Sequence, residues 1–145
     1  RSRMDRVLGG REDIARVGDR FVFQSEVLFG IGSARLGPEG ETELGKLGEV
    51  LRQVAAEAPE GLDWVLRVDG HTDRQPIGPG GRYADNWELS AARALSVVRY
   101  LIEEEEVPPE RLAATGFGQY RPVTEGDTPE ARARNRRIEF KFTER

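Results

Sequence analysis

The densest group of polar side chains lies between residues 69 and 74, where Asp69, His71 and Asp73 alternate along the chain. In an extended strand, side chains two residues apart point to the same face, so these three would lie together. Two carboxylates and one imidazole can bind zinc or iron, or act as a general acid and base. A metal site would need further ligands, and His71 is the only histidine. The alternative is that Asp69 and His71 satisfy backbone groups of a loop by hydrogen bonding.

Arg93 is the second candidate for chemistry. A helix over residues 85–102 would place Arg93 on a line with Leu89 and Val97. If this helix crosses near the end of the strand that precedes Asp73, Arg93 and Asp73 would face one cleft. Guanidinium binds carboxylate as a bidentate fork and carboxylate accepts from ammonium, so the pair would suit a zwitterionic amino-acid group. The alternative is a surface arginine paired with a nearby carboxylate, and periodicity alone does not decide between them.

Other catalytic chemistries have weaker support. The chain has no cysteine, which excludes disulfides, thiol nucleophiles and thiolate metal ligands. It has no Gly-x-Ser-x-Gly nucleophile elbow, and the glycine-rich stretch 78–81 lacks the Lys-Ser/Thr ending of a phosphate-binding loop.

The elements that must position these residues follow from the apolar patterns. Strands are expected where bulky residues alternate and helices where they recur at helical spacing, which predicts a strand over 19–29, a helix over 39–58, a strand over 62–68, a helix over 85–102, a strand over 112–117, a helical turn over 129–134 and a strand over 137–142. The order β-α-β-α-β-(α)-β predicts an α/β or α+β fold, with a mixed sheet and helices packed on it. Residues 1–17 are expected to be a lead-in and 18–145 the domain.

The helix over 85–102 has the clearest local signals. Asp85 followed by Glu88 is typical of a capping box. Pro108 and Pro109 follow this helix and prevent it from continuing. Its apolar residues are expected to form one stripe composed of Trp87, Ala91, Ala94, Leu95, Val98, Leu101 and Ile102.

Length and composition describe one globular domain of 145 residues. The 22 basic and 26 acidic residues give a net charge of −4, which offers no electrostatic reason to expect nucleic acid or an anionic membrane as partner. No stretch approaches the ~20 apolar residues that a membrane helix needs. Because the chain begins with Arg1 rather than Met, we expect it to be a fragment of a longer protein, with any export signal or membrane anchor in the missing part.

Four motifs, in order and in register, resemble the signature of OmpA-like peptidoglycan-binding domains: residues 70–73 (GHTD), 86–94 (NWELSAARA), 116–122 (GFGQYRP) and 135–138 (NRRI). The sequence of the second motif, together with VLF at 27–29 and GSA at 32–34, is most similar to the MotB-like branch. The resemblance extends from about residue 20 to 143. Two places depart from it: Gly30-Ile31 replaces the Asp or the Pro-Ser usual there, and the loop 76–84 has an unusual form.

The resemblance implies a domain that binds the diaminopimelate of the peptidoglycan stem peptide without cleaving it and without a cofactor. Asp73 would hold the ligand's ammonium group and Arg93 its carboxylate. The resemblance also implies that Thr72, Asn86 and Leu89 line the same pocket and that Arg137 lies next to it.

In such proteins the domain lies in the periplasm and attaches an inner-membrane protein to the cell wall. The hypothesis is therefore an anchor, in one version a subunit of a motor stator, with peptidoglycan, a second copy of itself and a membrane channel protein as partners. Two alternatives stay open. One is a metal-assisted hydrolase that uses Asp69, His71 and Asp73. The other is a dimerisation module without wall binding, for which Gly30 gives slight support.

Overall fold

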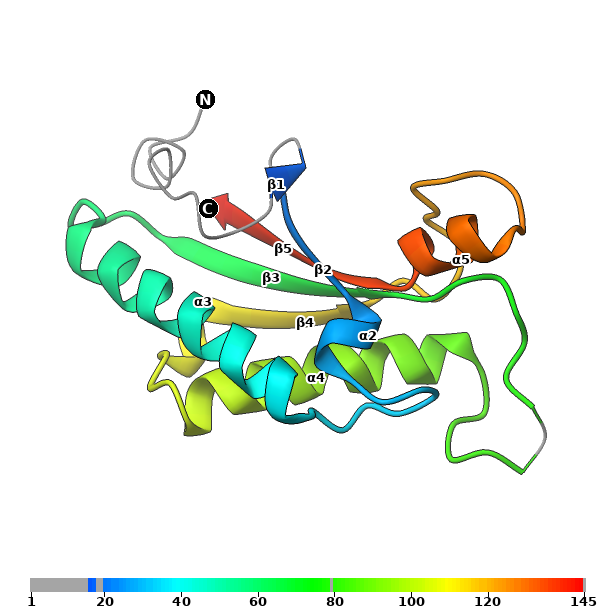
Figure 1. The fold of residues 1–145 in the computed structure, drawn as a ribbon. Helices are drawn as coiled ribbons and strands as arrows, with labels where there is room; N and C mark the ends of the chain where they lie inside the picture. Colours follow the sequence, from blue (N-terminus) through cyan, green and yellow to red (C-terminus); the bar gives the residue numbers. More distant parts are fainter. Residues whose placement is uncertain (1–15, 18–19, 79, 145) are drawn as a thin grey trace.

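A five-stranded mixed sheet organises the protein (Figure 1). The structure, a computed structural model, describes residues 16–17, 20–78 and 80–144. The strands lie in the spatial order β1-β2-β5-β3-β4, with bounds Arg16–Val17 (β1), Arg20–Gln24 (β2), Arg137–Glu144 (β5), Trp64–His71 (β3) and Leu112–Gly116 (β4). Only β3 and β4 are parallel, and the other neighbours are antiparallel. The expected mixed sheet is confirmed.

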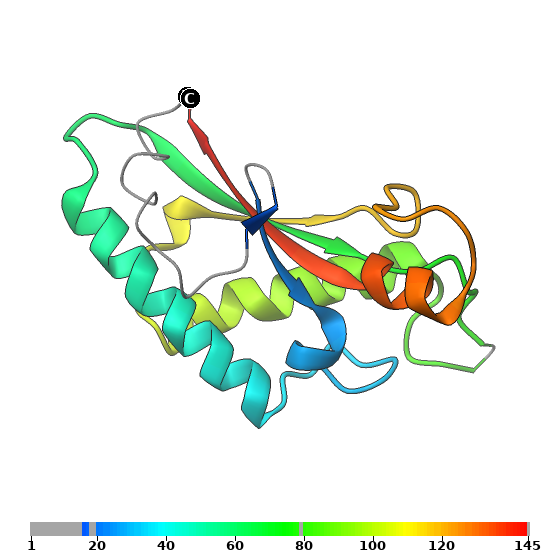
Figure 2. The same ribbon diagram turned by 45° about the horizontal axis from the view of Figure 1, so that its top comes forward.

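Helices cover one face of this sheet. The two long helices, α3 (Pro38–Glu57) and α4 (Asn86–Glu103), lie side by side beneath it (Figures 1 and 2). Three shorter elements complete the described chain: α2 (Ser25–Leu28), a 3-10 turn at Pro109–Arg111 and α5 (Pro129–Asn135). The predicted elements from residue 39 onward are confirmed within a few residues. No helix among the described residues is long and apolar enough to span a membrane.

Of the predicted lead-in, residues 1–15 lie outside the described residues. Arg16–Val17 form β1 and pair with β2. Asp19, the first residue of the strand predicted over 19–29, also lies outside the described residues.

Local sequence signals explain where the long helices begin. Pro38 occupies the first position of α3, where its missing N–H costs no hydrogen bond. At α4, the Asp85 carboxylate accepts from the Glu88 N–H at 2.9 Å. The Glu88 carboxylate in turn accepts from the N–H of Ala84 at 3.0 Å. The predicted capping box is thus present, with its return bond one residue earlier than in the usual pattern.

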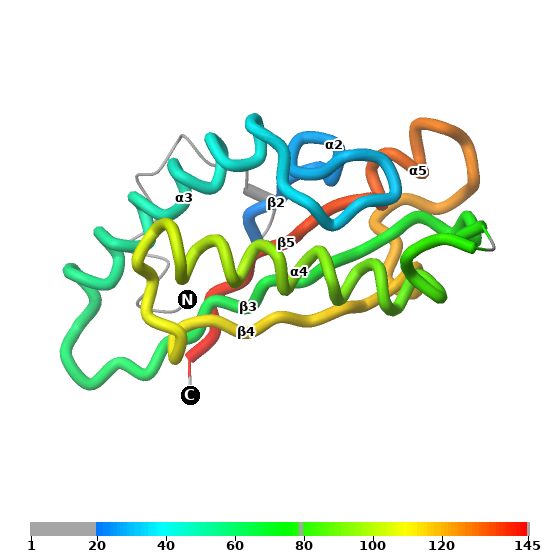
Figure 3. Tube along the Cα trace, turned by 90° about the horizontal axis from the view of Figure 1, so that it is seen from below, coloured from blue at the N-terminus to red at the C-terminus, as the bar shows by residue number. Residues whose placement is uncertain are grey.

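The core lies between the sheet and the two long helices. Alternate residues of β3 and β5 point towards the helices, while their neighbours point to the other face. The fully buried apolar side chains come from α2, α3, α4, β3 and β5 and include Leu28, Leu44, Leu47, Leu51, Leu66, Leu101, Ile138 and Phe140. This core packs α4 along β3 and β4 on the helical face of the sheet (Figure 3).

Two glycines let α4 approach the sheet closely. A Cβ atom at Gly70 in β3 would lie 2.1 Å from the Ser90 carbonyl oxygen of α4. At Gly116 in β4 it would lie 2.7 Å from the Ala91 nitrogen. A methyl group at either place would force the helix away from the sheet. The small residues therefore set the position of every side chain that α4 carries.

The predicted strand over 19–29 is wrong in its second half. The chain leaves the sheet at Ser25, whose N–H donates to the Arg136 carbonyl at 2.9 Å. The Ser25 carbonyl then accepts from the Phe29 N–H at 2.8 Å, which closes a single helical turn. A turn of four residues is too short to show helical periodicity, and its buried Leu28 fits an alternating pattern equally well.

The predicted apolar stripe of α4 is also displaced. Trp87 and Leu95, both assigned to it, are 50% and 39% exposed. The buried face keeps Ala94, Val98 and Leu101 of the predicted stripe. It extends on the side of Leu89, Arg93 and Val97 rather than on that of Trp87 and Leu95. A prediction from hydrophobic residues alone misplaces the centre of the buried face, because Arg93, one of its buried residues, is charged.

Candidate functional site

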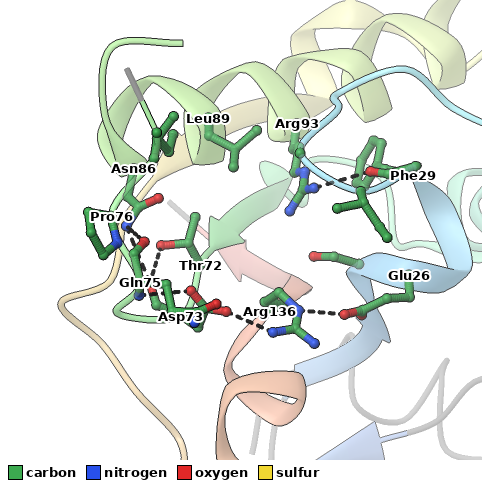
Figure 4. Close-up of a pocket in the computed structure, with 16 residues that line it drawn as sticks. Glu26, Phe29, Thr72, Asp73, Gln75, Pro76, Asn86, Leu89, Arg93 and Arg136 are labelled. Atoms are coloured by element: carbon green, nitrogen blue, oxygen red, sulfur yellow. Dashed lines mark hydrogen bonds and ion pairs between the residues drawn. The ribbon is translucent and has the colours of Figure 1, made fainter. Parts of the chain in front are cut away.

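A cavity of about 580 Å³ opens between the start of α4, the loop after β3 and the turn α2 (Figure 4). We call it the Asp73 pocket. Its wall combines charged, amide and apolar groups, contributed by Ser25, Glu26, Phe29, Gly30, Ile31, Gly32, Thr72, Asp73, Gln75, Pro76, Ile77, Gly78, Asn86, Leu89, Arg93 and Arg136. The structure thus brings Asp73 and Arg93 to one cavity, which is the geometry that the cleft hypothesis requires.

Arg93 enters the pocket as a buried cation that is 4% exposed. Its Nε donates to the Ser33 carbonyl at 2.8 Å, and its guanidinium carbon lies 5.2 Å from the centre of the Phe29 ring. No carboxylate among the described residues lies within ion-pair distance of it. Burial lowers the pKa of the Arg93 guanidinium, because removal from water penalises its charge. The pocket therefore contains a positive charge held only by carbonyls and a ring face.

Asp73 sits on the opposite side of the pocket, and Arg136 lies beside it. The Arg136 guanidinium donates to the Asp73 carboxylate at 2.7 Å and also bonds the Glu26 carboxylate (Figure 4). The other Asp73 oxygen accepts from the Gln75 N–H at 3.0 Å, which fixes the carboxylate against its own loop. Two carboxylates thus share one guanidinium whose side chain is 31% exposed.

Three further residues that the sequence assigned to the site also line the pocket. Thr72 donates its hydroxyl to the Asp73 carbonyl at 2.8 Å. The Asn86 amide donates to the Gln75 carbonyl at 3.0 Å and lies 3.3 Å from that of Asp73. Leu89 supplies an apolar wall and is 7% exposed. Thr72 and Asn86 therefore hold the loop that carries Asp73, and α4 supplies Asn86 and Arg93 from one rigid element.

Comparison with protein families matches residues 28–136 of this chain to the OmpA family. The chain belongs to the OmpA family. Among its relatives is YtxE of Bacillus subtilis, which is 36% identical over 119 residues, or 82% of this chain and 46% of YtxE. The chain therefore spans less than half the length of this curated relative.

Solved structures place this OmpA-family domain in the MotB-like branch. The structure of a MotB-like protein from Desulfovibrio vulgaris is 32% identical, with a TM-score of 0.80 over 98% of this chain and 85% of that one. The cell wall anchor of the T6SS from Pseudomonas aeruginosa is 30% identical, with a TM-score of 0.73 over 98% and 96%. The expected family, branch and fold class are confirmed.

Arg137, which the resemblance placed next to the pocket, lies elsewhere. Successive residues of a strand point to opposite faces, and Arg137 is the first residue of β5. Its guanidinium bonds the Glu139 carboxylate at 2.6 Å and the Arg121 carbonyl at 2.8 Å. The arginine that reaches the Asp73 pocket is its neighbour, Arg136.

The group of Asp69, His71 and Asp73 is also divided by the structure. β3 ends at His71, and beyond it Asp73 turns into the pocket. Asp69 and His71 stay within the strand and meet Glu139 of β5, with ligand atoms all within 4.8 Å of one another. Burial raises the pKa of the Asp69 carboxyl, partly offset by its bond to Arg67. The predicted hydrolase site is therefore not assembled from these three residues.

Pocket residues that were not assigned to the site from the sequence include Ser25, Glu26 and Arg136. The first two lie on the turn that was predicted as strand. Ser25 is 2% exposed, and its hydroxyl has no hydrogen-bond partner. The motif NRRI at 135–138 contained a usable signal for Arg136, because two adjacent arginines at a strand start must point in different directions.

Proposed function

We propose that this domain binds peptidoglycan without cleaving it, by holding the zwitterionic end of diaminopimelate in the Asp73 pocket. Arg93 receives the ligand's carboxylate and Asp73 its ammonium group. The observation that carries the proposal is the buried Arg93 guanidinium, which faces the same cavity as Asp73 and has no carboxylate partner among the described residues. Belonging to the OmpA family supports the same assignment.

The electrostatics of the pocket fit a neutral ligand with separated charges. A buried cation is costly unless an anion compensates it, so Arg93 gains from an arriving carboxylate. The fork geometry of guanidinium allows two parallel hydrogen bonds to that group. The four ionised side chains that line the pocket, Glu26, Asp73, Arg93 and Arg136, sum to zero charge. A zwitterion leaves that balance unchanged.

The rest of the pocket matches the other parts of an amino-acid side chain. Leu89 and Phe29 provide apolar walls for a methylene chain. The unpartnered Ser25 hydroxyl offers one more hydrogen bond to a ligand. Non-catalytic binding is consistent with this wall, which contains no histidine or cysteine, and with the names of the relatives, one of which is a cell wall anchor.

The biological role follows from where such a pocket meets its ligand. The domain would lie in the periplasm and attach an inner-membrane protein to the wall. A motor stator subunit is the specific version that MotB-like similarity favours. In that version a second copy of the domain and a membrane channel protein are further partners.

The test is co-sedimentation of the domain with purified sacculi. Asp73→Asn and Arg93→Met each remove one charge with little change in size. Losing one partner of a desolvated charged contact costs about 2–5 kcal/mol, so either variant should lose detectable binding. Arg99→Gln, an exposed arginine on the same helix, is the matched control and should bind normally.

Circular dichroism and urea unfolding establish that the variants fold. Titration of the wild-type domain with a diaminopimelate-containing muropeptide, against the same peptide with lysine in that position, then tests the ligand group. Full retention of folded Asp73→Asn and Arg93→Met on sacculi would refute the proposal.

A further inference from the structure

A second polar cavity, of about 500 Å³, lies on the face of the sheet that points away from α4. Gly70 faces α4, so its neighbours Asp69 and His71 in β3 face the other way. We call the charged residues that the strands contribute to it, with His71, the β3–β5 cluster: Arg20, Arg67, Asp69, His71, Arg137 and Glu139. Phe117, Arg121, Pro122 and Val123 complete the wall of the cavity.

The carboxylates of this cluster are already engaged by guanidinium groups. Arg67 donates its Nε to both Asp69 oxygens, at 2.9 and 3.0 Å. Glu139 accepts from Arg137 at 2.6 Å, and its other oxygen lies 3.2 Å from Arg20. A metal ion at Asp69, His71 and Glu139 would have to displace these partners. The group therefore has the residue types of a metal site without free carboxylate oxygens.

The charge of the cavity wall also opposes a cation. Four arginines against two carboxylates give a net charge of +2 when His71 is neutral. The pKa of His71 is lowered to about 4, first by burial and then by the positive charge of Arg137, which outweighs Glu139. The positive field of the arginines, which adds to the effect of burial on His71, would also repel a metal ion and attract an anion.

His71 is the unexplained member of the cluster. It is 4% exposed, yet neither ring nitrogen has a hydrogen-bond partner. Its Nε2 lies 3.7 Å from Glu139, too far for a hydrogen bond, and its ring stacks on Phe117 at 5.0 Å. A buried donor without a hydrogen-bond partner is costly, so native proteins rarely leave one without a use.

We propose that this cavity binds an oxyanion, a carboxylate or a phosphate group, through the imidazole N–H of His71 and the guanidinium groups of Arg67 and Arg121. Both anions match the fork geometry of arginine. Arg121 is exposed at the mouth of the cavity, with its guanidinium carbon 5.9 Å from the centre of the Phe117 ring. The site is separate from the Asp73 pocket and does not depend on wall binding.

The single histidine of the chain gives a direct probe. Long-range ¹H–¹⁵N spectra of the labelled domain report only the His71 ring. We would titrate inorganic phosphate, sodium acetate, sodium chloride and zinc chloride separately. The expected result is a saturable shift of the ring signals with phosphate or acetate, beyond the shift that chloride gives at equal ionic strength. Saturation with phosphate alone assigns a phosphate site, and saturation with acetate assigns a carboxylate site.

Arg121→Gln is the main variant, because this exposed arginine pairs with no carboxylate among the described residues and its loss should leave the fold intact. Anion affinity should fall at least about tenfold, the factor expected for losing a hydrogen bond to a charged group. Arg99→Gln on α4 should change nothing. Binding of an anion should also raise the His71 pKa in the wild type, which needs no variant.

Three results would overturn the proposal. One is a shift that never saturates and equals that of chloride. Another is saturation by zinc with no response to either anion, which would make the cluster a metal site. The third is unchanged anion affinity in folded Arg121→Gln. Retention on sacculi is a separate measurement, so this site and the Asp73 pocket can fail independently.

Discussion

The Asp73 pocket and the β3–β5 cluster contain the same kinds of charged side chain but use them differently. In the cluster, each carboxylate is held by an arginine within 3.2 Å and is at most 7% exposed. In the pocket, Asp73 and Glu26 share one arginine, and Arg93 has no acidic partner among the described residues. Of the paired charges in the cluster, Arg20 and Glu139 join two neighbouring strands, β2 and β5. Charges that are separated across a cavity are available to a ligand.

The same two stretches of chain supply both regions. β3 gives Asp69 and His71 to the cluster, and the loop just beyond it gives Asp73 to the pocket. Likewise Arg136 enters the pocket while Arg137 enters the cluster. The division occurs where each strand begins or ends. A one-residue change of position therefore decides whether a charge serves stability or binding.

The largest contrast should come from removing one carboxylate in each region. Glu139→Gln leaves Arg137 buried without its anion and should lower the free energy of unfolding by about 3–5 kcal/mol. Asp73→Asn breaks an ion pair whose arginine is 31% exposed and should cost less than about 1 kcal/mol. Urea unfolding measures both. Glu144→Gln, exposed at the end of β5, is the control, and equal losses at positions 139 and 73 would contradict the contrast.

Acidification should weaken the cluster through His71. Its pKa is lowered from 6.5 to about 4 on folding, so the stability it contributes is present above pH 6.5 and is lost as pH falls towards 4. The shift corresponds to about 3 kcal/mol. The ionisable groups that face it are Arg20, Arg67, Asp69, Arg137 and Glu139.

The measurement is urea unfolding of the wild type and of His71→Gln between pH 7.5 and 4. The carboxylates that titrate in both proteins cancel in the difference, which isolates the imidazole. A difference curve that stays flat from pH 6.5 to 4 would show that the His71 pKa is not lowered.

Much of the fold could be predicted from the sequence, because long periodic segments carry strong signals. The helix of Arg93 and the strand before Asp73 were both predicted, and the motif match linked the two residues. The partners of the charges could not be predicted. The direction of Arg136 and Arg137 depends on the residue at which β5 begins, and Glu139 reaches His71 only through the pairing of β3 with β5. The turn at Ser25 is set by a bond to the Arg136 carbonyl, a contact distant in sequence.

A smaller effect is expected from moving α4 without touching any charge. In Gly70→Ala the new methyl group would lie 2.1 Å from the Ser90 carbonyl, so the helix must shift. Such overpacking costs about 1–3 kcal/mol. Because α4 carries Asn86 and Arg93, retention on sacculi should fall as well.

The control for Gly70→Ala is Gly45→Ala in α3, where the nearest atom to a new Cβ is 3.8 Å away. That variant should be as stable as the wild type or gain up to about 1 kcal/mol. Normal retention of Gly70→Ala would mean that the pocket tolerates a displaced helix.

The smallest effect should come from replacing Glu26. This change tests whether Glu26 keeps the Asp73 carboxylate available to the ligand's ammonium group. Glu26 draws on the same Arg136 guanidinium as Asp73, so it weakens the hold of Arg136 on that carboxylate. In Glu26→Gln the guanidinium pairs with Asp73 alone and competes better against an ammonium group. Exposed pairs are worth about 0.2–1 kcal/mol, so muropeptide affinity should fall about two- to fivefold. Isothermal titration against Glu49→Gln, an exposed residue of α3, measures this. Tighter binding in Glu26→Gln would instead mean that Glu26 competes with the ligand's carboxylate for the arginines of the pocket.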